Sequence, residues 1–101
     1  MVFDVYEVSV IVEFTEKKEG EQRIFLVGER AFLVVNKNTI ELRTDEHLKK
    51  VLCEEYESVM ESRYFGRGGI EIVMSGQFSN EELEDFVRLS YNLTLKKEQD
   101  V

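Results

Sequence analysis

A change in the spacing of apolar residues near residue 44 is the feature that most constrains the fold of this chain. Before that point, β-branched and aromatic residues alternate with polar ones, which is the period-two pattern of strands. After it, apolar residues recur at helical spacing, which is the pattern of amphipathic helices. The sequence therefore predicts a sheet-forming first half and a mainly helical second half.

The first half predicts an antiparallel meander of about four strands, because polar turns interrupt the alternating pattern. We expect turns at residues 15–21, 28–30 and 36–38, the first of them fully solvated. The expected strands are residues 1–14, 23–27, 31–35 and 39–43. Residues 8–12 are apolar at nearly every position, so we expect this end of the opening strand to be buried on both faces.

The second half predicts a helix that begins near Asp45, with Thr44 or Asp45 as its N-terminal cap. Its apolar face has the spacing i, i+3, i+4 and i+8 and consists of Leu48, Val51, Leu52 and Tyr56. Residues 59–60 either extend this helix or lie in the loop after it. We expect residues 63–69 to be irregular and residues 69–74 to form a strand.

Ser79 and Glu82 form the capping-box pattern that starts a last helix. The predicted buried face of this helix is Leu83, Phe86, Val87, Ser90 and Tyr91. The predicted order is β-β-β-β-α-β-α: an α+β fold in which an antiparallel sheet carries two C-terminal helices packed on one face. A chain of 101 residues has room for one core, so we expect a single domain over residues 1–101.

The charge of the chain argues against a general affinity for nucleic acid. The formal net charge is −8 at pH 7, and residues 45–101 hold thirteen acidic and seven basic side chains. Phosphate contacts from basic side chains normally dominate nucleic-acid binding. Any nucleic-acid surface must therefore be local and must work against the overall field.

Cysteine and histidine each occur once, at Cys53 and His47, which excludes an intramolecular disulfide and a zinc site made of Cys and His alone. No nucleophile–base pair is recognisable, so we expect a non-enzymatic protein without catalytic residues, cofactor or metal. The chain lacks an apolar run long enough to span a membrane and a recognisable leader pattern. We therefore expect a cytoplasmic protein with no membrane partner.

Four segments resemble the MmcQ/YjbR family in order and spacing. They are residues 27–32 (VGERAF), 40–48 (IELRTDEHL), 74–78 (MSGQF), and 80–83 with 90–91 (NEEL and SY). The family consists of small bacterial α+β domains with a CyaY-like fold, often described as candidate DNA-binding proteins. The resemblance, which extends from residue 27 onward, implies that fold and DNA as a partner. The TfoX N-terminal domain family has a similar plan and is the less similar relative.

The chain departs from the family pattern at three places. Family members usually start with a helix, whereas this chain opens on an expected strand. The family segment before the last strand commonly reads Asn-Lys-x-His-Trp, whereas residues 65–69 read FGRGG. Ser79 stands where a proline normally precedes the final helix. The second departure removes the polar and aromatic residues on which the family's own site would be sought.

Basic, aromatic and glycine residues interleave in one segment, residues 63–69. Guanidinium groups bind phosphates, aromatic rings stack on bases, and glycines allow a backbone to approach closely. The candidate nucleic-acid-binding residues are Arg63, Tyr64, Gly66, Arg67, Gly68 and Gly69. The alternative is a flexible connection between helix and strand whose aromatic residues fill the core. The glycines precede a strand, so neither a dinucleotide fingerprint nor a P-loop is present.

The remaining polar features have simpler explanations. We expect His47 to be an exposed histidine and Cys53 a partly buried thiol at the edge of an apolar helix face. The acidic clusters at residues 54–57 and 81–85 mix directions around their helices, so we expect solvated faces and no metal site. The opening apolar strand, if it lies at a sheet edge, favours pairing with a second copy. A homodimeric or protein-interaction module is therefore the alternative to nucleic-acid binding.

Overall fold

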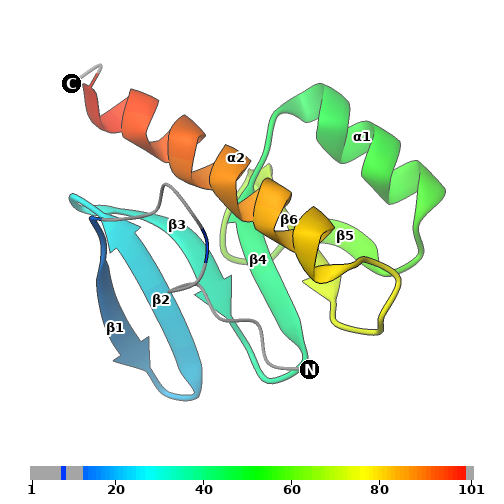
Figure 1. The fold of residues 1–101 in the computed structure, drawn as a ribbon, viewed down its shortest axis with the longest axis horizontal. Coiled ribbons are helices and arrows are strands. Elements are labelled where there is room, and N and C mark those ends of the chain that lie inside the picture. Colours follow the sequence, from blue (N-terminus) through cyan, green and yellow to red (C-terminus); the bar gives the residue numbers. More distant parts are fainter. Residues whose placement is uncertain (1–7, 9–12, 100–101) are drawn as a thin grey trace.

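The computed structural model, which describes Val8 and residues 13–99, contains one six-stranded antiparallel sheet in the order β1-β2-β3-β4-β6-β5 (Figure 1). The strands are β1 (Thr15–Glu19), β2 (Gln22–Val27), β3 (Arg30–Val35), β4 (Thr39–Arg43), β5 (Val59–Ser62) and β6 (Gly66–Val73). The helices are α1 (Glu46–Glu55) and α2 (Asn80–Gln99). This confirms the predicted α+β class with an antiparallel sheet and two helices.

The strands β2, β3 and β4 lie within one residue of the predicted ranges, whereas the first turn was predicted wrongly. Residues 15–19 form β1, and only residues 20 and 21 make the turn into β2. Gly20 has a φ of 62°, a left-handed conformation that glycine adopts without strain. The predicted opening strand of residues 1–14 lies almost wholly outside the described residues.

Residues 59–60, for which a helix or a loop was expected, instead belong to β5. β5 pairs with β6 on the outer edge of the sheet, so the observed order has one strand more between the helices than predicted. β6 also begins earlier than predicted, at Gly66, so residues 66–69 are part of a strand.

Both helices begin at the caps that their sequences provide. The Asp45 carboxylate accepts the Leu48 backbone N–H at 2.8 Å, which satisfies one of the free donors of the first turn of α1. α1 ends before Tyr56, which is its C-terminal cap and packs on Phe78 with ring centroids 4.7 Å apart. The capping box of α2 is confirmed, because the Glu82 N–H donates to Ser79 Oγ at 3.2 Å and the Ser79 N–H donates to Glu82 Oε1 at 3.0 Å.

The helices share one core with the sheet (Figure 1). α2 runs across the sheet, while α1 packs at the end of the sheet formed by β5 and β6. Ile40 and Leu42 of β4 stand opposite Ile72 and Ile70 of β6, and all four are at most 1% exposed. Leu52 of α1 and the α2 residues Leu83, Val87 and Tyr91 complete this layer.

A register shift between β2 and β3 places two consecutive β3 residues in the core. Leu26 pairs with Ala31 and Phe25 pairs with Leu33, so Phe32 is the extra residue of a bulge. Phe32 and Leu33 are both fully buried in the main core. The Phe32 ring meets Tyr91 of α2 edge-on at 5.1 Å, which ties the bulge to the helix.

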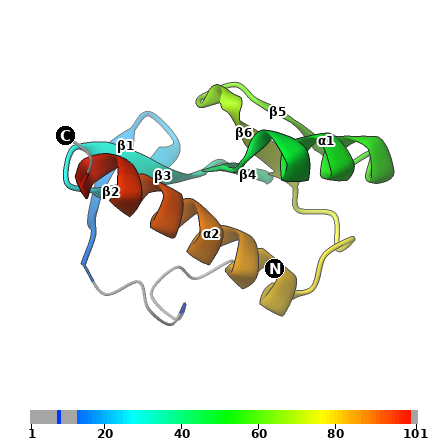
Figure 2. The same cartoon turned by 90° about the horizontal axis from the view of Figure 1, so that it is seen from above.

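The opposite face of the sheet is covered in part by the turn of the β5–β6 hairpin, which rises on the side away from α2 (Figure 2). Phe65 of this turn packs on a second apolar cluster formed by Ile24, Ala31 and Val34. The Arg43 guanidinium lies over the Phe65 ring at 4.9 Å from its centroid. The hairpin turn is thus a structural cover for the sheet as well as a surface element.

Neither described helix is long and apolar enough to cross a membrane.

Candidate functional site

The candidate loop is the tip and second strand of the β5–β6 hairpin. Residues 63–65 form the turn, and the pairing passes from Glu61 with Ile70 directly to Ser62 with Gly66. Residues 67–69 of β6 therefore have no pairing partner on β5. The irregular segment that the sequence predicts is thus a large register shift within a strand. Gly66 has a φ of 61°, which fits glycine at the end of the turn.

Gly69 is required by packing. A Cβ atom there would lie 2.6 Å from the Leu42 carbonyl oxygen and 2.6 Å from the Phe65 Cβ. The buried Gly69 thus lets the hairpin approach β4 closely, whereas Gly68 is exposed and its nearest neighbour would be the Phe65 carbonyl at 3.7 Å. Gly66 and Gly69 shape the hairpin, and this requirement would hold without any ligand, whereas the packing does not require a glycine at position 68.

Arg63 is held by a buried carboxylate. Its Nε donates to Glu71 Oε1 at 3.0 Å and its Nη2 to Glu71 Oε2 at 2.7 Å, while the Thr39 hydroxyl donates to the same Oε2 at 2.8 Å. The Arg63 side chain is 76% exposed, whereas that of Glu71 is 3% exposed. The hydrogen bonds from Arg63 lower the pKa of Glu71 below its ordinary value, against the opposing effect of burial.

Glu41, the neighbour of Glu71 across the sheet, is bonded by neutral groups. Its Oε1 accepts the Ser62 hydroxyl and the Tyr64 backbone N–H, both at 2.9 Å. Its Oε2 accepts the Asn36 amide at 2.8 Å. Together, Glu41 and Glu71 fasten the hairpin turn to the face of the sheet that lies away from the helices.

Arg63 and Tyr64 line a small pocket on this face together with Gln22 and Glu41, with a volume of about 190 Å³. Glu41 is 1% exposed, whereas Tyr64 is 43% exposed. The buried carboxylate therefore forms the base of the pocket, and the aromatic and guanidinium groups form its rim.

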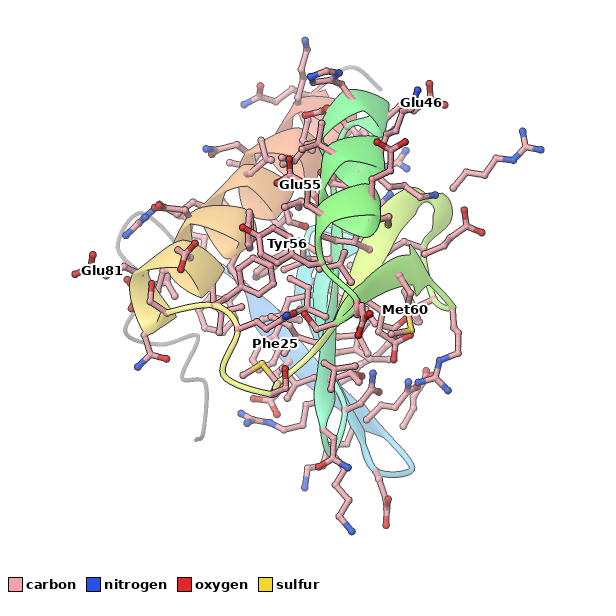
Figure 3. The ribbon with its side chains drawn as sticks, turned by 90° about the vertical axis from the view of Figure 1, so that its right-hand side faces the viewer. Phe25, Glu46, Glu55, Tyr56, Met60 and Glu81 are labelled. Atoms are coloured by element: carbon pink, nitrogen blue, oxygen red, sulfur yellow. The ribbon has the colours of Figure 1, made fainter. Side chains whose placement is uncertain are left out.

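Arg67 lies in a different and larger hollow, between α1 and the start of β6. Its volume is about 400 Å³, and its lining residues are Glu46, Lys49, Lys50, Cys53 and Arg67. We call it the α1–β6 groove. The four α1 residues have the spacing i, i+3, i+4 and i+7, so they form one stripe along the helix. Figure 3 shows α1 with Glu46 at its first turn and Glu55 at its end, beside the hairpin that carries Met60.

The α1–β6 groove holds three basic side chains and one acidic one in a strongly acidic protein. Lys49 pairs with Glu61 of β5 and also donates to the Arg67 carbonyl at 3.2 Å. This contact with Lys49 lowers the pKa of the Glu61 carboxyl. Lys50 and Arg67 are exposed, and neither makes an ion pair with any residue in the described part of the chain. Both cations are therefore available to an anionic ligand.

The other polar candidates lie where the sequence predicted. His47 is exposed on α1, Cys53 is half-buried, and the acidic residues 54, 55 and 57 are exposed. Within residues 13–99 and Val8, no three His, Cys, Asp or Glu side chains are grouped so that they could hold a metal ion.

The structure divides the candidate residues between two sites. Arg63 and Tyr64 line the pocket on the sheet face, and Arg67 lines the α1–β6 groove. Sequence reasoning missed Lys49 and Lys50, although their helical spacing with Glu46 and Cys53 was a usable signal. It also missed the pairing of Glu41 with Glu71, which depends on the register between β4 and β6.

Comparisons with known proteins support the fold. No known family model matches the chain, and no curated protein matches it in sequence. The structure is similar to the crystal structure of the Deinococcus radiodurans protein DR2400, which has a DUF419 domain. The TM-score is 0.75 at 18% sequence identity, over 84% of this chain and 70% of that one. This likeness shows that the two chains share a small α+β fold.

Proposed function

We propose that the chain is a small non-enzymatic binding module of the MmcQ/YjbR type that binds nucleic acid at the α1–β6 groove. The observation that carries the proposal is the meeting of Lys49, Lys50 and Arg67, from two separate elements, at one groove of an acidic protein. Basic groups that converge against the sign of the overall charge favour a local polyanion site. The sequence resemblance favours DNA as that polyanion.

Lys50 and Arg67 are assigned the main phosphate contacts, because Lys49 is paired with Glu61. Arg63 is assigned a smaller share, since Glu71 already neutralises its guanidinium. Tyr64, exposed at the tip of the same hairpin, supplies a ring on which an unpaired base can stack.

Fluorescence anisotropy with labelled single-stranded and duplex DNA, at low and then rising salt, tests this proposal. The informative variant is the double substitution Lys50→Glu/Arg67→Glu. Its matched control is Lys96→Glu/Lys97→Glu, which makes the same change in charge at the exposed end of α2. We expect salt-dependent binding that the groove variant loses and the control largely keeps. Absence of binding at low salt, or equal loss in both variants, would reject the groove as a nucleic-acid site.

A second candidate function is self-association through β5. This strand is at the edge of the described sheet, and the exposed large apolar side chains among the described residues, Met60 and Tyr64, both lie on its hairpin. An edge strand with apolar side chains favours pairing with another copy. Light scattering after size exclusion should then report a dimer that Met60→Lys dissociates, and a monomeric wild type would exclude this candidate.

A further inference from the structure

The pocket on the sheet face has a buried negative charge at its base. Glu41 and Glu71 are 1% and 2% exposed, and they occupy directly paired positions on β4 and β6. Arg63 donates two hydrogen bonds to Glu71, whereas the groups in the described part of the chain that donate to Glu41 are all neutral. Two buried carboxylates thus share one bonded cation, and a buried charge normally requires an opposite charge close by.

Two oxygen atoms of the residues that line the pocket can each accept a further hydrogen bond. A carboxylate has about four lone-pair sites, and Glu41 uses two on Oε1 and one on Oε2. The Gln22 amide donates to the Asn36 side-chain oxygen at 2.8 Å, and the hydrogen bonds of the described residues leave its own carbonyl oxygen free to accept. The free Glu41 site and the Gln22 carbonyl are acceptors, so they suit a ligand that donates.

We propose that this pocket, lined by Gln22, Glu41, Arg63 and Tyr64, binds an organic cation through a terminal primary ammonium or guanidinium group. The cation donates to the Glu41 carboxylate and the Gln22 carbonyl, and it supplies the second positive charge that the carboxylate pair lacks. The exposed Tyr64 ring at the rim offers a cation–π contact to the same group. The net charge of −8 raises the local concentration of cations around the protein.

The size of the pocket restricts the ligand. Its volume of about 190 Å³ is below the roughly 300–1,000 Å³ of pockets that enclose a drug-sized molecule. It therefore accommodates the end of a chain, such as one end of a free polyamine or the side chain of a lysine or arginine in a peptide. An anion is disfavoured, because Arg63, the one cationic side chain among the described residues that line the pocket, is bound to Glu71, and the Glu41 carboxylate lies at the base.

Amide NMR provides a direct test, because the Tyr64 backbone N–H donates to Glu41 and reports on any group that binds there. The ¹⁵N-labelled protein is titrated with propylammonium, with propylguanidinium and with a short lysine-containing peptide, against sodium chloride at equal ionic strength. We expect saturable shifts centred on the Tyr64 amide and the Gln22 side-chain amide. Stronger binding of the peptide than of the free cations would identify a protein partner as the source, and the reverse would identify a small molecule.

Two variants decide whether Glu41 is responsible. Glu41→Gln should weaken binding by about tenfold or more, the loss expected for one charge-assisted hydrogen bond. Glu57→Gln removes the same charge from an exposed position and should leave binding unchanged. If Glu41→Gln does not fold, Tyr64→Ala, at a partly exposed rim position, should weaken binding several-fold. Shifts spread over exposed carboxylates, or equal losses in Glu41→Gln and Glu57→Gln, would each overturn the proposal.

Discussion

Glu41 of β4 and Glu71 of β6 are directly paired across the sheet, and both side chains are buried on the face away from the helices. Like charges opposite each other on neighbouring strands destabilise a sheet. Here the cost is offset by hydrogen bonds from the β5–β6 hairpin, namely those of Arg63 to Glu71 and of Ser62 and Tyr64 to Glu41. The hairpin turn is thus held in place by hydrogen bonds to Glu41 and Glu71, whose strength depends on the ionisation of the two carboxyl groups.

Acid should weaken the contribution of Arg63 to stability. The pKa of Glu71 is lowered from its ordinary value of 4.5, chiefly by the hydrogen bonds from Arg63. A carboxyl whose pKa is lower in the folded state stabilises that state above its unfolded pKa, and this stabilisation is lost as the pH falls through the folded pKa. Arg63→Gln should therefore lower the urea midpoint near neutral pH, and the gap to wild type should close below a pH of about 4.5.

Arg88→Gln is the control for this prediction. Arg88 pairs with Glu84 and Asp85 on the surface of α2, where ion pairs contribute little to stability. Its gap to wild type should be small at every pH. A gap for Arg63→Gln that stays constant into strong acid would show that Arg63 acts through packing and not through Glu71.

Substitution by alanine should destabilise the protein at Gly69 but have little effect at Gly68. Gly69→Ala places a Cβ 2.6 Å from the Leu42 carbonyl oxygen, and relief of that clash requires a backbone shift. We expect a loss of about 1–3 kcal/mol in the free energy of unfolding, as for other overpacked sites. Gly68→Ala meets nothing closer than 3.7 Å and should change stability by less than about 0.5 kcal/mol. Equal urea midpoints for the two variants would contradict the observed packing of the hairpin on β4.

Ser79 should stabilise α2 through its capping box. Its Oγ accepts the Glu82 N–H at 3.2 Å, and its own N–H donates to Glu82 Oε1 at 3.0 Å. Ser79→Ala removes the first bond and should cost about 1 kcal/mol in unfolding free energy. Ser75→Ala, in the exposed turn before the helix, is the control and should be nearly neutral. A neutral Ser79→Ala in thermal unfolding would show that packing alone fixes the start of α2.

Local patterns predicted those elements whose apolar residues form a run or recur at a regular spacing. The strands β2 to β4 and both helices carry such patterns, so their ranges were predicted closely. The sequence of β1, TEKKE, predicts a turn because it has no apolar residue and therefore no apolar alternation. β5 has four residues, of which Val59 is the one in the main core, too few to show a period. Pairing with a neighbouring strand defines both of these edge strands.

The candidate sites were predicted only in part, for a related reason. Residue types identified the hairpin with Arg63, Tyr64 and Arg67. They could not show that Arg63 is bound by Glu71, because that contact depends on how the turn folds back on the sheet. The α1–β6 groove likewise requires the packing of α1 beside β6, which no local pattern encodes. Its basic stripe on α1 was readable, but its convergence with Arg67 was not.

Ser90 shows a role that the helical pattern of buried residues did not reveal. The pairing of β3 with β4 ends at Leu33 and Leu42, next to the bulge at Phe32. Ser90 Oγ of α2 continues the connection, because it accepts the Arg43 N–H at 2.8 Å and donates to the Phe32 carbonyl at 2.6 Å. A helix hydroxyl thus replaces a missing hydrogen bond of the sheet.

Ser90→Ala should therefore cost about 1–3 kcal/mol in unfolding free energy, since it leaves a buried donor and a buried acceptor without this partner. Hydrogen exchange should locate the effect, with faster exchange at the Arg43 amide than in the wild type. Thr94→Val is the matched control, because the Thr94 hydroxyl is equally buried and its hydrogen bond within the described part of the chain is to the Ser90 carbonyl of its own helix. It should leave exchange at Arg43 unchanged. Unaltered stability and unaltered Arg43 protection in Ser90→Ala would mean that the two strands need no bridge from α2 at the bulge.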